Sequence, residues 1–284
     1  MTQEQAYPNL VIVDGQRCFD ERYKGLPVPG SKLTGERTGR HIVKNAKRYS
    51  TMHATFDTHP HNHWSFKKNW MNKDGSDIVV PGPHRLVTID DIENGDIVHR
   101  WGNRTMLFGQ DTMLVSEYAK MYVNKVGQID LWDDHGIPDE PEYALQPEIA
   151  AALRDRAALT GVDVNRVQKG YYPHSDQYGG LEAALPNPAF PETGMNNDFL
   201  TMAAKASVIV FAGLEGTHCV KDTFLQVVRF LPNKVRDFVI LEDLVGVLPD
   251  YGFPGTNFPQ QWEEFKHDMV KLGVTITNSD VFRP

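Results

Sequence analysis

The sequence predicts an α/β fold in which helices cover both faces of a mostly parallel sheet of about six strands, giving three layers. Short apolar runs alternate with helical patterns along most of the 284 residues, and such alternation is typical of buried parallel strands. The run 207–212, Ser-Val-Ile-Val-Phe-Ala, is the clearest buried strand, and Gly213 ends it. We expect one domain over residues 1–284, with residues 67–127 as an inserted lobe.

Apolar periodicity and the breakers at segment ends define the individual elements. Strands are expected at 10–13, 50–56, 128–132, 164–167, 207–212, 238–241 and 274–276. Helices are expected at 40–48, 147–158, 197–204, 220–230 and 258–272. Pro147 suits a first helical turn, and Gly273 suits the residue that closes the last helix. Residues 67–127 are rich in Gly, Asn and Asp and contain no clear strand–helix–strand unit, which is why we expect a lobe there.

Composition limits the classes of function. Lys plus Arg number 29 and Asp plus Glu number 37, giving a net charge of −8. No basic stripe is present, so we do not expect nucleic acid as a partner. The chain opens with no signal-peptide pattern and has no window of 18 apolar residues, so no membrane is expected. Two cysteines, Cys18 and Cys219, make no disulfide framework, and we expect a reducing, cytoplasmic setting.

The segment 57–63, Asp-Thr-His-Pro-His-Asn-His, holds one carboxylate and three imidazoles directly after a predicted strand. Alternate residues at a strand end point the same way, so Asp57 and His59 can reach one ion together. Such ligands suit one divalent metal ion, with Zn first and Fe or Mn as alternatives. A polar surface loop is the competing interpretation, and three clustered imidazoles favour the metal.

Other chemically active side chains follow the remaining predicted strands. Asp14 follows the first strand, His135 the strand 128–132, and Lys169 the strand 164–167. In open parallel sheets, sites lie beyond the carboxyl ends of the strands, so these groups are expected to converge. Asp14 is costly at a buried strand end unless it has a partner, and Lys169 is a candidate for that partner.

Cys219 is the candidate nucleophile because it lies where a strand and turn lead into a helix. The partial positive charge and free N–H groups of a helix N-terminus lower the pKa of a thiol and can hold an oxyanion. Burial as a small apolar side chain is the alternative. For Cys18, which no predicted helix start accompanies, we expect that structural role.

Taken together, these motifs resemble the isochorismatase-like cysteine hydrolases, and most closely the metal-containing nicotinamidases. The resemblance extends from about residue 10 to residue 277. It rests on Val13-Asp14-x-Gln16…Phe19, Asp57-x-His59-Pro…His63-x-Ser65-Phe66, Trp132-x-x-His135, Lys169-Gly170 and Ala212-Gly…His218-Cys219-Val220.

The resemblance implies a Cys219–Asp14–Lys169 triad, and a cis peptide between Leu214 and Glu215. It implies a metal held by Asp57, His59 and His135, with His63 as a ligand or behind the ligands. In those enzymes the metal anchors the pyridine nitrogen of the substrate. His84 is an alternative third ligand. Relatives are often dimers or tetramers, so a homo-oligomer is expected.

The chain departs from the family pattern at three places. Arg17-Cys18 stands where the family usually has Asn-Asp, Gly136 stands where a Cys usually follows the ligand His, and Glu215 brings a carboxylate to the cis position. We expect Glu215 to tune substrate choice. Phe19 and Trp64 are expected to line a pocket for a flat ring, with core packing as the alternative.

The sequence therefore predicts an amidase that converts a small, heteroaromatic carboxamide to its acid and ammonia through a thioester. Cys219 would attack, Asp14 would move the proton, and backbone N–H groups near Glu215 and Cys219 would hold the oxyanion. Hydrolysis of a ureide or an aliphatic amide is an alternative. A non-catalytic metal-binding protein on the same fold is another, and it requires an inert Cys219.

Overall fold

The computed structural model describes residues 8–79, 84–252 and 255–284. Among these residues, a six-stranded sheet forms the centre of the body, and every neighbouring pair in it is parallel. The strand order is β12 (Thr275–Thr277), β11 (Phe238–Val245), β10 (Ile209–Gly213), β1 (Asn9–Val13), β2 (Thr51–Asp57) and β9 (Asn165–Lys169). The predicted parallel sheet is confirmed.

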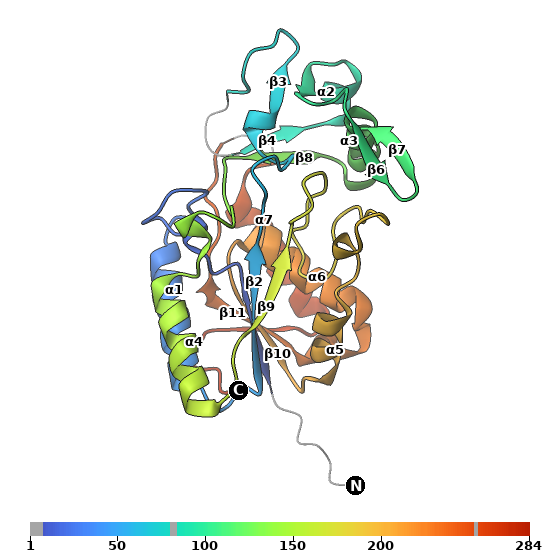
Figure 1. Ribbon diagram of the computed structural model, residues 1–284. Coiled ribbons are helices and arrows are strands. Elements are labelled where there is room, and N and C mark those ends of the chain that lie inside the picture. Colours follow the sequence, from blue (N-terminus) through green and yellow to red (C-terminus); the bar gives the residue numbers. More distant parts are fainter. Residues whose placement is uncertain (1–7, 80–83, 253–254) are drawn as a thin grey trace.

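Helices cover both faces of this sheet, which gives the three predicted layers (Figure 1). One face carries α1 (Ser31–Lys44) and α4 (Pro147–Thr160); the other carries α5 (Asn197–Lys205), α6 (Lys221–Phe230) and α7 (Phe258–Lys271). The side chains of β1 alternate between the two layers, because successive residues of a strand point to opposite faces. Leu10 and Ile12 pack under α1 and α4, whereas Val11 and Val13 pack under the other three helices.

A lobe lies beyond the carboxyl ends of β2 and β9 (Figure 1). It contains β3 (Trp70–Asn72), β4 (His84–Val87), α2 (Ile89–Glu93), β5 (Ile97–His99), β6 (Thr105–Phe108), β7 (Asp111–Leu114), α3 (Val115–Val126) and β8 (Ile129–Trp132). It has an apolar core of its own, to which α3 contributes Tyr118 and Tyr122. The lobe therefore covers the edge of the sheet where the candidate site residues were expected.

The strand at 128–132 exists, but our expectation that it joins the alternating strands of the main sheet is wrong. β8 pairs antiparallel with β4 in a separate two-stranded sheet. All four of its residues are buried, and that pattern resembles a central parallel strand. Its burial comes instead from the core of the lobe, in which Ile129 and Leu131 pack.

The first helix begins nine residues earlier in the chain than its periodicity indicated, at Ser31 rather than residue 40. Gly35 and Gly39 weaken the helical pattern of its first turns, because glycine has low helix propensity. They also allow close packing on α4. A Cβ on Gly39 would lie 2.9 Å from the carbonyl oxygen of Glu148.

We therefore expect Gly39→Ala to lower the free energy of unfolding by about 1–3 kcal/mol, as overpacked interiors do. Helix propensity alone would give the opposite sign, a gain of about 1 kcal/mol. Urea unfolding measures the difference. Val43→Ala, on the exposed side of the same helix, is the control and should not be destabilising. A stabilised Gly39→Ala variant would contradict the close packing of α1 on α4.

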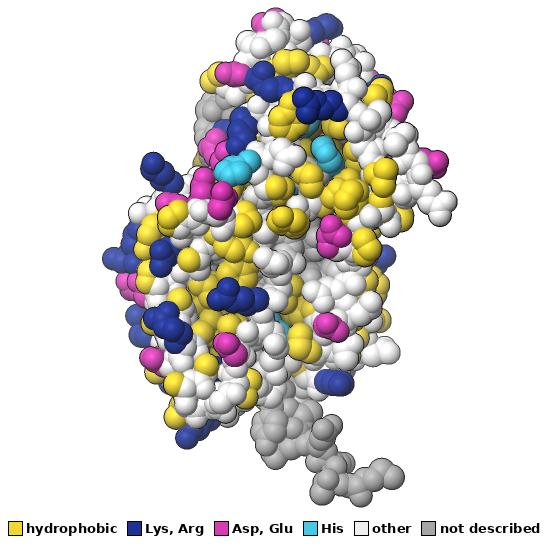
Figure 2. All heavy atoms as spheres, in the orientation of Figure 1, with side chains coloured by type: hydrophobic (Ala, Val, Ile, Leu, Met, Phe, Trp, Pro, Cys, Tyr) yellow, Lys and Arg dark blue, Asp and Glu magenta, His cyan; other side chains and the backbone are white. Residues whose placement is uncertain are grey.

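Charge is distributed without segregation on the face shown in Figure 2, where basic and acidic side chains are interspersed over the body and the lobe. Within the described residues, no helix combines the length and the apolar character needed to span a membrane.

Candidate functional site

A buried lysine, Lys169, contacts the two other residues expected to form a triad with it, Asp14 and Cys219. The Nζ atom of Lys169 lies 2.9 Å from Asp14 Oδ2 and 3.4 Å from Cys219 Sγ. It also lies 2.8 Å from Asp57 Oδ1. The side chain of Lys169 is fully buried. One cation therefore faces two carboxylates and a thiol, away from solvent.

Strand register produces this arrangement. Asp57 and Lys169 are direct partners in the parallel β2–β9 ladder, and β1 runs beside β2. Asp14 follows β1 with a φ of 44°, in the left-handed region that Asp tolerates better than most residues. Its backbone N–H donates to Thr55 Oγ1 at 3.0 Å, and the Thr55 hydroxyl donates to Asp14 Oδ1 at 2.5 Å. Thr55 thus holds both the backbone and the side chain of Asp14 in place.

Burial and charge set the protonation of the three groups. Burial alone would lower the pKa of Lys169, but the charges of Asp14 and Asp57 outweigh it and raise that pKa well above its usual value. The lysine is therefore a cation at neutral pH. Burial raises the pKa of Asp14 against the opposing effect of Lys169. A carboxylate with a raised pKa is suited to accept a proton during a reaction.

Cys219 lies in a single π-helical turn, Gly216–Val220, that joins β10 to α6. Burial raises the pKa of its thiol well above the usual value, and Lys169 acts in the opposite direction. The resting side chain is a neutral thiol. A nearby base must therefore take the proton when the sulfur reacts, and Asp14 is the group placed to do so.

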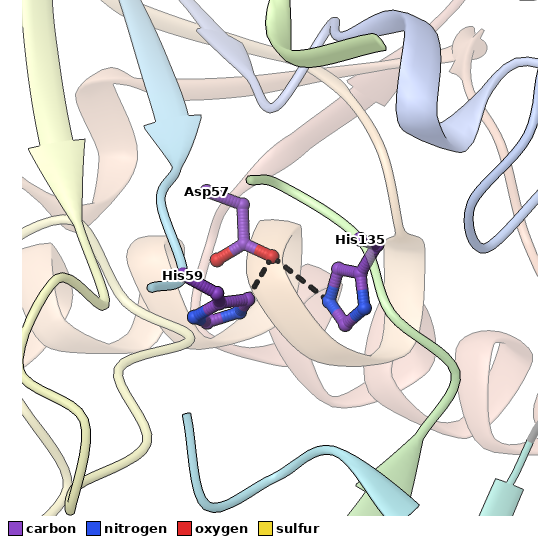
Figure 3. Close-up of side chains that lie close together, drawn as sticks. All are labelled: Asp57, His59 and His135. Atoms are coloured by element: carbon purple, nitrogen blue, oxygen red, sulfur yellow. Dashed lines mark ion pairs between the residues drawn. The ribbon is translucent and has the colours of Figure 1, made fainter. Parts of the chain in front are cut away.

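The second cluster consists of Asp57, His59 and His135, whose ligand atoms all lie within 4.8 Å of one another (Figure 3). The Nε2 atoms of His59 and His135 lie 3.1 and 3.2 Å from Asp57 Oδ2. The Nδ1 atoms lie 3.2 Å from the carbonyl oxygen of Gly170 and 2.7 Å from that of Asp133, respectively. Histidine ligands of metals usually engage a backbone carbonyl through one ring nitrogen in this way, which orients the other nitrogen towards the metal. These residues fit a divalent cation.

Asp57 belongs to both clusters. Its Oδ1 contacts Lys169, and its Oδ2 faces the two histidines. Burial alone would raise the pKa of Asp57, but His59 and Lys169 lower it well below its usual range. The carboxyl group is therefore ionised, as a metal ligand must be, and it links the Lys169 cluster to the candidate metal site.

His63 lies behind the ligands. Its ring lies against that of His59, with centroids 4.1 Å apart. Its Nδ1 lies 2.7 Å from Ser65 Oγ, and its Nε2 lies 3.3 Å from the carbonyl oxygen of Ser175. Both nitrogens are thus engaged. The alternative ligand His84 begins β4, and its side chain lies outside the described residues.

Two glycines make room for His59. Gly136 and Gly170 have φ values of 64° and 78°, in the region that favours glycine. A Cβ on Gly136 would lie 2.7 Å from the carbonyl oxygen of Asp57, and one on Gly170 would lie 2.8 Å from the ring of His59. The departure from the family pattern at position 136 therefore has a local steric reason.

The aromatic residues expected at the pocket have different positions. Phe19 lies against His135, with ring centroids 5.5 Å apart. The expectation for Trp64 is corrected: it is fully buried in the core of the lobe and packs on Tyr118 and Tyr122. The preceding residue, His63, packs on the candidate ligand His59, whereas Trp64 packs in the core of the lobe. Trp132, for which we predicted no role, packs in the same cluster as Phe19.

The peptide between Leu214 and Glu215 is cis, as the resemblance implied. The expectation that Glu215 tunes substrate choice is corrected, because its carboxylate is turned into the backbone of its own turn. It accepts hydrogen bonds from the backbone N–H groups of Thr217 and His218, at 2.9 and 3.1 Å. Its backbone N–H has no acceptor among the described residues, so this donor is available for an oxyanion.

Sequence reasoning missed a further residue that holds the site together. The side chain of Gln16 accepts from the N–H of Asp57 at 2.7 Å and donates to the carbonyl oxygen of the same residue at 3.0 Å. It therefore joins the ends of β1 and β2. A signal was present, because a Gln two residues after a buried Asp is hard to place in a core unless its amide pairs with a backbone.

Comparisons with known proteins identify the fold that carries this site. No family model matches the chain, and no curated protein matches it. Solved structures do match. The yeast nicotinamidase bound to the inhibitor nicotinaldehyde has a TM-score of 0.60 and 16% identity, over 95% of this chain and 99% of that one. A Pyrococcus horikoshii pyrazinamidase in complex with zinc has a TM-score of 0.53 and 17% identity, over 95% and 98%.

An isochorismatase family protein from Desulfovibrio vulgaris is similar over 97% of this chain and 95% of its own, with a TM-score of 0.51 and 12% identity. The chain has the isochorismatase-like fold. At identities this low the likeness concerns the fold, and any activity has to be argued from the residues of the site. The isochorismatase-like fold confirms the architecture expected from the sequence.

The candidate metal site of Asp57, His59 and His135 leads to a direct prediction. His135→Ala should lower the metal content of the purified protein and weaken metal affinity by more than about tenfold, because even indirect ligand partners contribute 10–100-fold. Elemental analysis after dialysis against a stated metal measures this. His61→Ala is the matched control, since His61 belongs to the same motif but its side chain is exposed and pairs with Asp139. Unchanged metal content in His135→Ala would remove His135 from the ligand set.

Proposed function

We propose that this protein is a cysteine amidohydrolase that converts a small carboxamide to the corresponding acid and ammonia. The observation that carries the proposal is the contact of one buried cation, Lys169, with both the candidate nucleophile Cys219 and the candidate base Asp14. A solvated lysine would have no such role. A purely structural ion pair would not require a thiol beside it.

The reaction proceeds in two halves. In the first, Cys219 Sγ attacks the amide carbon and Asp14 takes the thiol proton. The carbon–nitrogen bond then breaks, and Asp14 gives the proton to the leaving amine, which departs as ammonia. In the second, a water molecule gives a proton to Asp14 and adds to the thioester. The carbon–sulfur bond breaks, and the proton returns to the sulfur.

Charge develops on the carbonyl oxygen in both halves. Within the part of the chain that the structure describes, the backbone N–H of Glu215 has no acceptor, and the N–H of Cys219 belongs to the turn that follows it. Donors fixed in advance at this position stabilise the oxyanion, a contribution of about 3–4 kcal/mol per donor in enzymes where it has been removed. Lys169 holds Asp14 and Cys219 together and keeps the local charge balanced.

Asp57, His59 and His135 would hold a divalent metal ion, for which we propose zinc. When bound, the ion supplies a Lewis-acid position to which a ring nitrogen of the substrate can coordinate. Phe19 lies on the ring of His135 and offers a flat apolar surface beside that position. We therefore propose a nicotinamide-like, heteroaromatic carboxamide as the substrate class.

Ammonia release from a panel of amides tests the proposed function. The panel contains pyridine-3-carboxamide, benzamide, an aliphatic amide and a ureide, each with zinc-loaded and chelator-treated protein. The proposal predicts hydrolysis of pyridine-3-carboxamide in preference to benzamide, and loss of that preference after chelation. Equal rates for these two amides would reject the ring-nitrogen anchor. Hydrolysis of the ureide alone would replace the substrate class.

A further inference from the structure

The turn that carries Cys219 contains a buried carboxylate of its own. The side chain of Glu215 accepts hydrogen bonds from the N–H groups of Thr217 and His218 and from the Thr217 hydroxyl, at 2.8–3.1 Å. Its second oxygen accepts from the N–H of Leu248 at 3.1 Å. The carboxylate therefore occupies the N–H groups that open the nucleophile's own helical turn.

The counter-ion of this carboxylate is the residue next to the nucleophile. His218 Nδ1 lies 2.8 Å from Glu215 Oε2. Burial alone would lower the pKa of His218, but the hydrogen bond and the charge of Glu215 outweigh it and raise that pKa above its usual value. Asp130 and Asp222 act in the same direction. The carboxylate 2.8 Å away therefore favours the protonated form of the imidazole.

Three aromatic rings surround this imidazolium. Its ring centroid lies 5.2 Å from that of Trp132, 5.5 Å from that of Tyr178 and 5.3 Å from that of Phe258. These distances are those of aromatic side chains in tilted or edge-to-face contact. The rings come from the end of β8, from the segment after β9 and from the start of α7. The residue beside Cys219 therefore joins the lobe to two parts of the body.

The charges of Glu215 and His218 affect how readily the thiol of Cys219 ionises. The N-terminus of a helix normally favours a thiolate, because its N–H groups and dipole are positive. Here Glu215 occupies those groups with a negative charge, which by itself opposes a thiolate four residues later in the same turn. His218 cancels that charge within the pair. Loss of the imidazolium would leave a buried carboxylate uncompensated beside the nucleophile.

We propose that Glu215 and His218 act as a positioning pair for Cys219: together they fix its turn against the lobe and the body, and the imidazolium removes a negative charge that would oppose the thiolate. The inference rests on the proposed function in that it takes Cys219 as the nucleophile. Neither residue is a catalytic residue, because both act through Cys219.

A charge cycle tests this pair through the reactivity of the thiol. The rate of Cys219 alkylation by iodoacetamide is measured at one neutral pH in the zinc-loaded protein, in a Cys18→Ala background that leaves one thiol. The variants are His218→Asn, Glu215→Gln and the double variant. His218→Asn should slow alkylation on the order of tenfold, since a like charge raises the pKa of a neighbouring acid. Glu215→Gln should not slow it, and the double variant should regain most of the loss.

The change in alkylation rate from His218→Asn to the double variant distinguishes an effect of charge from an effect of packing. If the pair were only structural, the double variant would alkylate no faster than His218→Asn, and that result would overturn the inference. Thr217→Val is the matched control, because it removes a hydroxyl that contacts both Glu215 and His218 without changing charge, and its alkylation rate should stay within about twofold. If His218→Asn does not fold, as judged from its melting temperature, Glu215→Gln decides alone: slower alkylation than the parent would contradict the proposal.

Measuring both alkylation and ammonia release on the same samples distinguishes failure of this inference from failure of the proposed function. Alkylation requires no amide substrate, so the cycle can succeed with a protein that releases no ammonia from any amide. In that case the positioning pair stands and the proposed amidase function fails. If ammonia is released but the cycle shows no recovery in the double variant, the amidase function stands and the inference fails.

Discussion

Cys219→Ala is expected to lower turnover on the order of 10³-fold or more while the protein remains folded, because covalent catalysis has no substitute for the sulfur in this site. The remaining donors and the metal group would still bind substrate, so KM should change far less than kcat. Steady-state ammonia release measures both constants, and the melting temperature checks the fold.

Cys18→Ala is the control for that substitution. Cys18 is the other cysteine of the chain, and it is buried among apolar residues next to Phe19. Its loss should leave kcat within a few-fold of the parent. Substantial activity in Cys219→Ala, or activity lost only in Cys18→Ala, would show that the nucleophile has been assigned to the wrong residue.

Lys169→Met should have the second largest effect, on both activity and stability. Removing the cation leaves two buried carboxylates, Asp14 and Asp57, without their shared counter-ion. Breaking a buried ion pair from one side costs about 3–5 kcal/mol, and urea unfolding should detect a loss of that order. Turnover should fall through kcat more than through KM.

The double variant Asp14→Asn/Lys169→Met separates the two roles of the lysine. It removes one of the unpaired carboxylates, so part of the lost stability should return, whereas activity should not. Unfolding free energies that are the same in the parent and in Lys169→Met would contradict the buried ion pair. Recovery of activity in the double variant would remove Asp14 from proton transfer.

Much of the site could be predicted because strand ends converge in a parallel sheet. Asp14 follows β1, and Asp57 and Lys169 end the neighbouring strands β2 and β9, so the topology of the sheet brings the three residues together. His135 was expected near them for the wrong reason, since β8 belongs to the lobe. It reaches the site because the chain returns from β8 directly towards the end of β2, where the N–H of His59 donates to the carbonyl oxygen of Gly136 at 2.8 Å.

Other features depend on contacts that periodicity does not report. Trp64 directly follows the His-rich segment 57–63 in the sequence, but its side chain packs in the core of the lobe. Glu215 looked like a specificity residue because a carboxylate is unusual there, and only the backbone of its turn reveals its partners. The helix α3 was detectable, since its buried residues recur at helical spacing, but the Gly- and Asn-rich segments around it obscured the pattern.

During turnover, Cys219 should carry the acyl part of the amide as a thioester. Intact-protein mass spectrometry of zinc-loaded protein, acid-quenched during turnover of pyridine-3-carboxamide, tests it most directly. We expect a mass increase equal to the acyl group less the thiol hydrogen, which peptide mapping locates on the peptide that contains Cys219 and which is absent from Cys219→Ala. Ammonia release by the parent with no adduct under any quench time, or with the same adduct in Cys219→Ala, would contradict it.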